Sequence, residues 1–138
     1  MATVKQATIK NTRQLAEANK ATGTVTTLGE ILVLTAGLAV AAADTATRET
    51  LLGVCNQTIA AADALTRVQY IVPSDEDTFI FSTTNNTATT DNGQDMIVGA
   101  NSTTINNTHT TSAVGVVRQV EPYGASTDKL IIGKFITV

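Results

Sequence analysis

Two residues of this chain could form a nucleophilic pair, the single cysteine, Cys55, and the single histidine, His109. A histidine beside a cysteine can activate the thiol for covalent catalysis. However, Cys55 lies in an apolar run, and His109 lies in a threonine-rich segment that has no glycine elbow or oxyanion motif. We interpret Cys55 as a small core residue and His109 as a solvated loop residue. The sequence therefore predicts no catalytic residue and no enzyme, and one cysteine allows no internal disulfide.

The carboxylates that could bind a metal are also arranged as turn residues. Asp75, Glu76 and Asp77 are adjacent, whereas calcium loops alternate their oxygen ligands and place a glycine between them. Asp91 and Asp95 flank an Asn-Gly dipeptide and are interpreted as turn formers. The glycines have neither Walker nor dinucleotide-binding spacing. We therefore predict no metal site and no cofactor.

Basic residues gather at the N-terminus. Residues 1–20 carry Lys5, Lys10, Arg13 and Lys20 against Glu17 alone, a net charge of +3, while the remaining chain carries five basic and eleven acidic residues, a net charge of −6. A basic arm on an acidic body suits binding to nucleic acid or to an acidic protein surface, although it also suits a solvated tail. The aromatic residues are not interleaved with a basic patch, and Arg67 near Tyr70 and Lys134 beside Phe135 are the only candidates for nucleic-acid contact. Direct nucleic-acid binding is therefore not expected.

The composition favours a β-rich domain with few charges. The 138 residues are 43% hydrophobic but only 15% charged, and 26 of them are threonine. Threonine is β-branched and suits half-exposed strands and loops. This length accommodates one domain with its own core. A weakly charged surface suits close lateral packing in an assembly.

An apolar stretch near the middle of the first half organises the expected fold. Ile31 to Leu34 and Leu38 to Ala42 are expected strands, joined by a turn at Thr35–Gly37 in which glycine accepts a positive φ. A third strand is expected to open at Leu51 and to extend through Ile59, with one helical turn between Ala43 and Thr50.

The remainder predicts short strands separated by polar turns. An alternating strand over 65–72 should have one wet side, with Val68, Tyr70 and Val72 on one face and Arg67, Gln69 and Ile71 on the other. Loops are expected at 83–95, with a type I′ turn at Asn92–Gly93, and at 101–111. Further strands are expected at 78–82, 96–99, 113–120 and 130–138, with a bulge near Gly133. This pattern predicts an all-β fold, a small antiparallel β-barrel or β-tulip-like sandwich over residues 23–138, preceded by an extended N-terminal arm over residues 1–22.

The first half could also imitate a secretion signal, because a basic segment precedes an apolar run and Ala41-Ala42-Ala43. The basic segment is too long for a signal peptide, and Glu30 borders the apolar run. The run is also too short to span a bilayer. We therefore expect neither export nor membrane insertion.

Two segments of the first half carry a family resemblance: Gly29–Val40, with the pattern G-E-x-x-x-L-x-x-G-x-A-V, and Leu52-Gly53-Val54-Cys55. Together they resemble the small capsid decoration, or cement, proteins of tailed bacteriophages. Further similar segments bring the resemblance to residues 24–138: 95–99, 105–107, 114–120 and 130–135.

The resemblance implies a β-barrel that binds the outside of an expanded icosahedral capsid and clamps neighbouring subunits of the major capsid protein. It implies a homo-oligomer, with a trimer favoured, located on the virion exterior and made in the host cytoplasm. The arm would lie on the shell, with Lys5, Lys10, Arg13 and Lys20 as candidate contacts. Alternatives are another virion component, such as a head fibre base or tail protein, or a small nucleic-acid-binding β-barrel.

Overall fold

The computed structural model describes residues 4–8, 14–110 and 115–136, and the side chains of 14–108 and 115–136. These residues form strands and three single-turn 3-10 helices, so the predicted all-β class is confirmed. The elements are β1 (Val4–Thr8), β2 (Gln14–Asn19), β3 (Ile31–Thr35), β4 (Leu38–Ala41), η1 (Arg48–Thr50), β5 (Leu51–Cys55), β6 (Arg67–Val72), β7 (Thr78–Thr83), η2 (Thr89–Asp91), β8 (Asp95–Val98), β9 (Thr104–Thr110), β10 (Val117–Pro122), η3 (Ser126–Asp128) and β11 (Leu130–Phe135).

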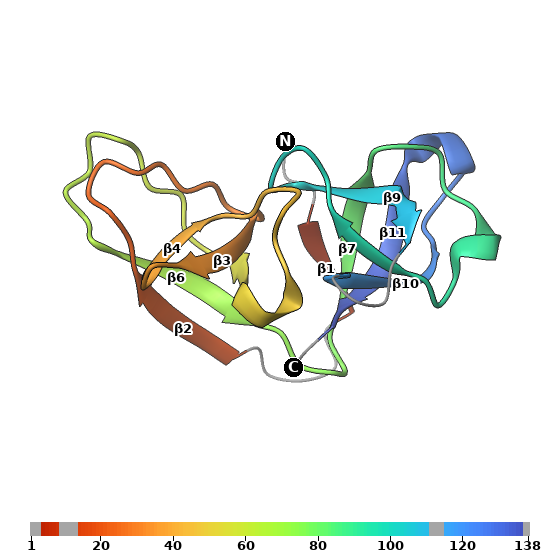
Figure 1. Ribbon diagram of the computed structural model, residues 1–138, viewed down its shortest axis with the longest axis horizontal. Helices are drawn as coiled ribbons and strands as arrows, with labels where there is room; N and C mark the ends of the chain where they lie inside the picture. Colours follow the sequence, from red (N-terminus) through yellow and green to blue (C-terminus); the bar gives the residue numbers. More distant parts are fainter. Residues whose placement is uncertain (1–3, 9–13, 111–114, 137–138) are drawn as a thin grey trace.

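The strands form two sheets that lie side by side (Figure 1). The first has the order β1-β7-β11-β10-β8-β9, and a parallel pairing of β9 with β7 closes its last five strands into a barrel. The second has the order β2-β6-β5-β3-β4 and curves until its edge strands β2 and β4 approach each other. Closure removes open strand edges from the barrel.

Three phenylalanines fill the barrel. Because side chains alternate along a strand, β7 and β11 direct Phe79, Phe81 and Phe135 to the same interior. The Phe135 ring lies edge-on to both others, with centroid distances of 5.4 Å to Phe79 and 5.3 Å to Phe81. Gly133 also points inward, and a Cβ there would approach the Phe81 ring to 3.1 Å. The expected bulge at Gly133 is instead a register shift in β10, between Gln119 and Glu121.

The same core continues into the five-stranded sheet. Four side chains of that sheet belong to the barrel's hydrophobic cluster: Ile31, Val33, Val54 and Ile71. Polar contacts follow the same border, because Ile31 N donates to Ser102 O at 2.9 Å and Ser102 Oγ donates to Glu30 Oε2 at 2.9 Å. The two sheets are therefore packed as one body.

Strand β6 is covered on both faces, contrary to the expectation of one wet side. Val68 is buried in a small cluster with Leu32 and Cys55, whereas Ile71 points the other way and is buried in the main core. The prediction of one wet side is wrong because the barrel covers the face on which Ile71 lies.

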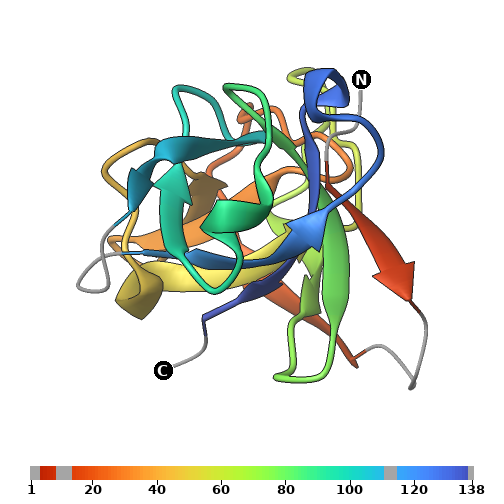
Figure 2. The same cartoon turned by 90° about the vertical axis from the view of Figure 1, so that its right-hand side faces the viewer.

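The N-terminal segment is partly incorporated into the sheets. Strand β1 pairs with the first part of β7, Thr78–Phe81, whereas β9 pairs with the last part of β7, at Ser82 and Thr83. Figure 2 shows β1 lying along β7 on the outside of the barrel. Strand β2 pairs with β6 in continuous register, from Gln14 opposite Val72 to Asn19 opposite Arg67. The predicted arm at 1–22 therefore supplies one edge strand to each sheet.

Two polar segments differ from their sequence-based expectations. The predicted loop at 101–111 contains β9, because Ile105 and Asn107 alternate into the interior. The buried Asn107 amide donates to Asn85 O at 3.1 Å and Asn86 O at 3.0 Å, which compensates its burial. The third strand was expected to reach Ile59, but β5 ends at Cys55, and Ile59 forms only an isolated bridge with Thr26.

The turn at Asn92–Gly93 has a different geometry from the expected type I′. Asn92 has φ −59° and ψ 131°, Gly93 has φ 83°, and Gln94 N donates to Asp91 O at 3.0 Å. These values describe a type II turn, which needs a positive φ only at its glycine. The type I′ expectation fails because β7 and β8, on either side of the segment, are not sheet neighbours and therefore form no hairpin.

Candidate functional site

Cys55 is a core residue, as the sequence predicts. It is 1% exposed, packs in the cluster that contains Leu32 and Val68, and donates from Sγ to Gln57 O at 3.1 Å. Burial raises the pKa of this thiol, although the bond to Gln57 partly offsets that effect. His109 lies on β9, and its side chain falls outside the described residues. A buried, protonated thiol is a poor nucleophile.

We expect the Cys55 thiol to react with Ellman's reagent only in unfolded chains. Because the folded state holds the proton at pH values where the unfolded thiol loses it, unfolding releases a proton above the unfolded pKa of about 8.5. The free energy of unfolding should therefore fall as the pH rises from about 8.5. Urea titrations at several pH values measure this slope. A Cys55→Ala variant should lose part of it, and an equal slope in both proteins would contradict the assignment.

The acidic turn at Asp75–Asp77 behaves as predicted at its last residue. Asp77 is buried and its Oδ2 accepts a hydrogen bond from Ser74 N at 3.0 Å. Within the described residues, no group of three histidine, cysteine, aspartate or glutamate side chains could hold a metal ion.

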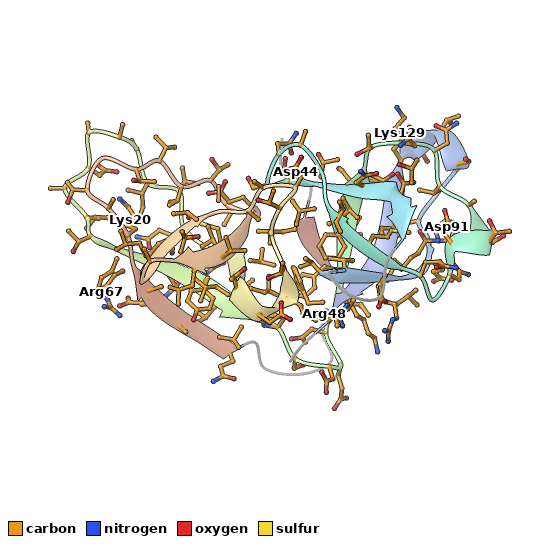
Figure 3. The ribbon with its side chains drawn as sticks, in the orientation of Figure 1. Lys20, Asp44, Arg48, Arg67, Asp91 and Lys129 are labelled. Carbon is orange, nitrogen blue, oxygen red and sulfur yellow. The ribbon has the colours of Figure 1, made fainter. Side chains whose placement is uncertain are left out.

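The four predicted contact cations have different positions. The backbone of Lys5 lies on β1 opposite Ile80, but its side chain is outside the part of the chain that the structure describes. Lys10 and Arg13 lie outside the described residues altogether. Lys20 is only 2% exposed, and its Nζ donates to Ala21 O at 2.9 Å (Figure 3). The prediction that Lys20 is a surface contact is therefore wrong, because its side chain is buried. Lys20 directly follows β2, and its backbone N donates to Thr66 O, which extends the pairing of β2 with β6 by one residue.

Asp95 was interpreted as a turn former, and the structure corrects this. It begins β8, is 7% exposed, and accepts hydrogen bonds from Arg118 Nε at 2.7 Å and Arg118 Nη2 at 3.3 Å. These bonds and the charge of Asp95 raise the pKa of Arg118. Arg48 Nη2, from η1 beside the other sheet, lies 3.7 Å from Asp95 Oδ2. The carboxylate thus forms an ion-pair cluster at the border of the two sheets.

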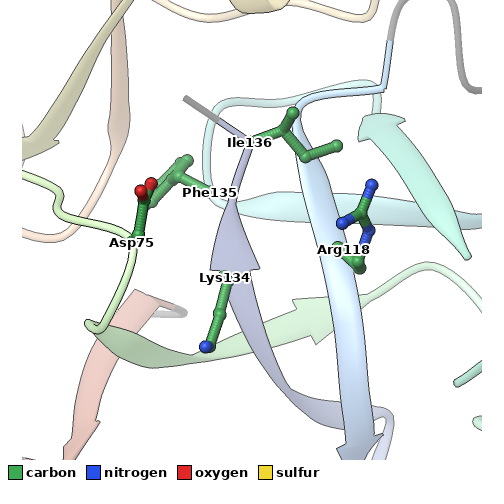
Figure 4. A pocket seen from close by; sticks show the side chains of 5 residues that line it. All are labelled: Asp75, Arg118, Lys134, Phe135 and Ile136. Atoms are coloured by element: carbon green, nitrogen blue, oxygen red, sulfur yellow. The ribbon is translucent and has the colours of Figure 1, made fainter. Parts of the chain in front are cut away.

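A surface hollow lies beside this cluster (Figure 4). It is lined by Asp75 before β7, Arg118 of β10, Lys134 and Phe135 of β11, and Ile136. Arg118 and Lys134 are direct cross-strand partners. The sequence indicated Lys134 and Phe135 only as neighbours in the chain, and it did not place them beside Arg118, because that contact depends on the pairing of β10 with β11.

Three large apolar side chains are about half exposed in loops that join strands of the five-stranded sheet. Val25 is 55% exposed and Leu28 is 50% exposed between β2 and β3, and Leu65 is 48% exposed between β5 and β6.

No helix among the described residues is long and apolar enough to cross a membrane. In comparisons with known proteins, no protein-family model matches the chain, and no curated protein is significantly similar to it.

Proposed function

We propose that this chain is a structural virion protein that binds the outside of a bacteriophage capsid. It would stabilise the expanded shell by clamping neighbouring subunits of the major capsid protein. The chain would act without a cofactor, as a homo-oligomer, with a trimer favoured, on the virion exterior after synthesis in the host cytoplasm. It would contact protein, with no direct contact to nucleic acid or membrane.

The placement of the two N-terminal strands supports this proposal best. Strands β1 and β2 occupy edges of two different sheets, and the side chains of β2 are mostly exposed, including Leu15 at 48%. Main-chain pairing with β6 thus provides most of the attachment of β2. Strand pairing of this kind is also a common way to bind an extended segment of another protein.

The energetics of a decoration protein need no catalytic site. A ligand that binds only the assembled lattice stabilises that lattice by mass action. Several weak contacts become a strong attachment when one oligomer makes them together.

The basic segment gives a direct test of the proposal. We expect the chain to co-sediment saturably with expanded heads of its source phage and not with unexpanded heads. A triple variant, Lys5→Gln, Lys10→Gln and Arg13→Gln, should bind expanded heads about tenfold or more weakly, because each charge contact contributes up to about 1 kcal/mol. This variant retains β2, whereas deletion of residues 1–20 would remove an integral strand.

Lys129→Gln is the matched control, because Lys129 is exposed on the barrel, outside the basic segment. It should bind heads as the parent chain does. Absence of binding to either form of head by the parent chain would refute the proposed function. Binding to free DNA that weakens steeply with salt would favour the nucleic-acid alternative.

A further inference from the structure

The turn at Asn92 and Gly93 contains the dipeptide that is most prone to deamidation in a polypeptide chain. The backbone nitrogen of the residue after an asparagine can attack the side-chain amide carbon and close a five-membered ring. Glycine hinders this closure least, because it has no side chain and few restrictions on its backbone angles. Both residues are exposed, so water reaches the turn. The chemistry of Asn92 therefore depends on how the fold holds it.

One residue of β10, Gln119, holds both of the groups that would react. Gly93 N donates to Gln119 O at 2.8 Å, and Gln119 Nε2 donates to Asn92 Oδ1 at 2.9 Å. Gln119 is 1% exposed, and its Nε2 also donates to Ala88 O at 2.8 Å. The nucleophile and the amide that it would attack are thus fixed to the same buried residue.

The backbone of the turn also keeps the two groups apart. Ring closure requires the Gly93 nitrogen to rotate until it eclipses Cβ of Asn92. With ψ 131° at Asn92, this nitrogen lies far from Cβ. Rotation of ψ would break the bond from Gly93 N to Gln119 O, and with it the turn that Gln94 N closes on Asp91 O at 3.0 Å. Deamidation therefore requires the turn to open.

Hydrogen bonds, rather than apolar burial, hold this segment on β10. Besides the three bonds described, Gln119 N donates to Gln94 O at 3.1 Å. The helical turn η2 within the segment contains no buried residue. Segments with few buried apolar contacts open locally, at a lower free energy than global unfolding. Residues 88–94 can therefore leave β10 while the barrel stays folded.

We propose that Asn92 is a site of spontaneous deamidation, and that its bonds to Gln119 restrict the reaction to the open turn. In the open turn, Gly93 N loses its proton and bonds to Asn92 Cγ. The bond from Cγ to Nδ2 breaks, and Nδ2 takes up a proton and leaves as ammonia. Water then opens the succinimide at either of its carbonyl carbons, which gives aspartate or isoaspartate. This site does not depend on the capsid role.

The two products differ in whether the turn can close again. Aspartate keeps the length of the main chain and a side-chain oxygen that can accept from Gln119 Nε2. Isoaspartate places Cβ of residue 92 in the main chain, so an extra carbon displaces Gly93 N from Gln119 O. Formation of isoaspartate would therefore release residues 88–94 from β10 irreversibly.

The test compares deamidation of the full chain in buffer and in urea, at one pH and temperature. Mass spectrometry of proteolytic fragments locates each converted asparagine. Amide hydrogen exchange at Gly93 gives the fraction of folded chains in which the turn is open. We expect Asn92 to convert first in urea, and at least about tenfold more slowly in the folded chain. The folded rate should equal the urea rate multiplied by the open fraction.

Two glutamine variants make the test specific. Gln119→Met keeps the size of the side chain, removes both bonds from Nε2 and should speed conversion of Asn92 in the folded chain about tenfold. Gln94→Met is the matched control, because Gln94 is exposed and bonds to Asp91 and Gln119 through its backbone. It should leave the rate unchanged. Asn101, exposed and outside the turn, is the internal reference in every sample.

Three results would overturn the proposal. The first is another asparagine that converts before Asn92 in urea. The second is a folded parent chain that converts Asn92 faster than the open fraction allows, because the closed turn would then react by itself. The third is an equal rate at Asn92 in the two folded variants. If Gln119→Met also speeds conversion of Asn101, it has loosened the whole fold, and the two rates of the parent chain then decide.

Discussion

Replacing Asp95 with alanine is expected to lower the free energy of unfolding by about 2–4 kcal/mol. The carboxylate is 7% exposed and lies against two arginines, with its shortest contact 2.7 Å from Arg118 Nε. Its loss leaves Arg48, whose side chain is 19% exposed, near Arg118 without the intervening negative charge. Urea unfolding should show the lower midpoint.

Glu121→Ala is the control for Asp95→Ala. Like the Asp95 variant it removes one negative charge, but Glu121 is an exposed residue of β10, so no buried carboxylate is lost. Its effect should stay within about 0.5 kcal/mol. If both variants unfold at the same urea concentration, the ion-pair cluster does not stabilise the border of the sheets.

Gly53→Ala should destabilise the chain by about 3 kcal/mol or more, through overlap with the neighbouring strand. Gly53 lies on β5 beside a register shift and has φ 156°. A Cβ there would overlap the carbonyl oxygen of Ile71 on β6, and it would lie 3.1 Å from Pro73 Cδ. The backbone of a central strand cannot move away without breaking its pairing. For a chain of this size, the midpoint of thermal unfolding should fall by about 10 °C.

Gly37→Ala separates the effect of crowding from that of the backbone angle. Gly37 has φ 80° in the β3–β4 turn, and nothing lies within 4 Å of a Cβ placed there. Only the strain of a left-handed backbone remains, about 1–2 kcal/mol. A Gly37 variant that loses as much stability as the Gly53 variant would show that steric overlap at β5 is not the main cost.

Elements specified by local residues were predictable, whereas those specified by distant contacts were not. The β3–β4 hairpin follows from an apolar run and the turn at Ala36–Gly37, where both residues have positive φ. Strand β9 was missed because Asn and Thr side chains indicate a loop, while the burial of Ile105 and Asn107 depends on β7 and β8.

The candidate site shows the same limit. The isolated features, Cys55 in a core strand and Asp77 in an acidic turn, were predicted because each depends on its immediate neighbours. The cross-strand pair of Arg118 and Lys134 depends on register, which composition and spacing do not reveal. Asp95 was assigned to a turn because the arginines that hold it come from distant positions in the chain.

The pairing of the N-terminal strands has a consequence for the order of folding during synthesis. Val4 pairs with Phe81, and Leu15 pairs with Ile71, so both strands emerge from the ribosome long before their partners. Contacts this distant in sequence slow folding, because a long loop must close before they form. Although β1 and β2 are synthesised first, they can pair only after β7 and β6 have been made. Until β1 and β2 are paired, β6 or β7 of a second nascent chain offers them the same pairing, so two chains made on one message can exchange strands before each one closes.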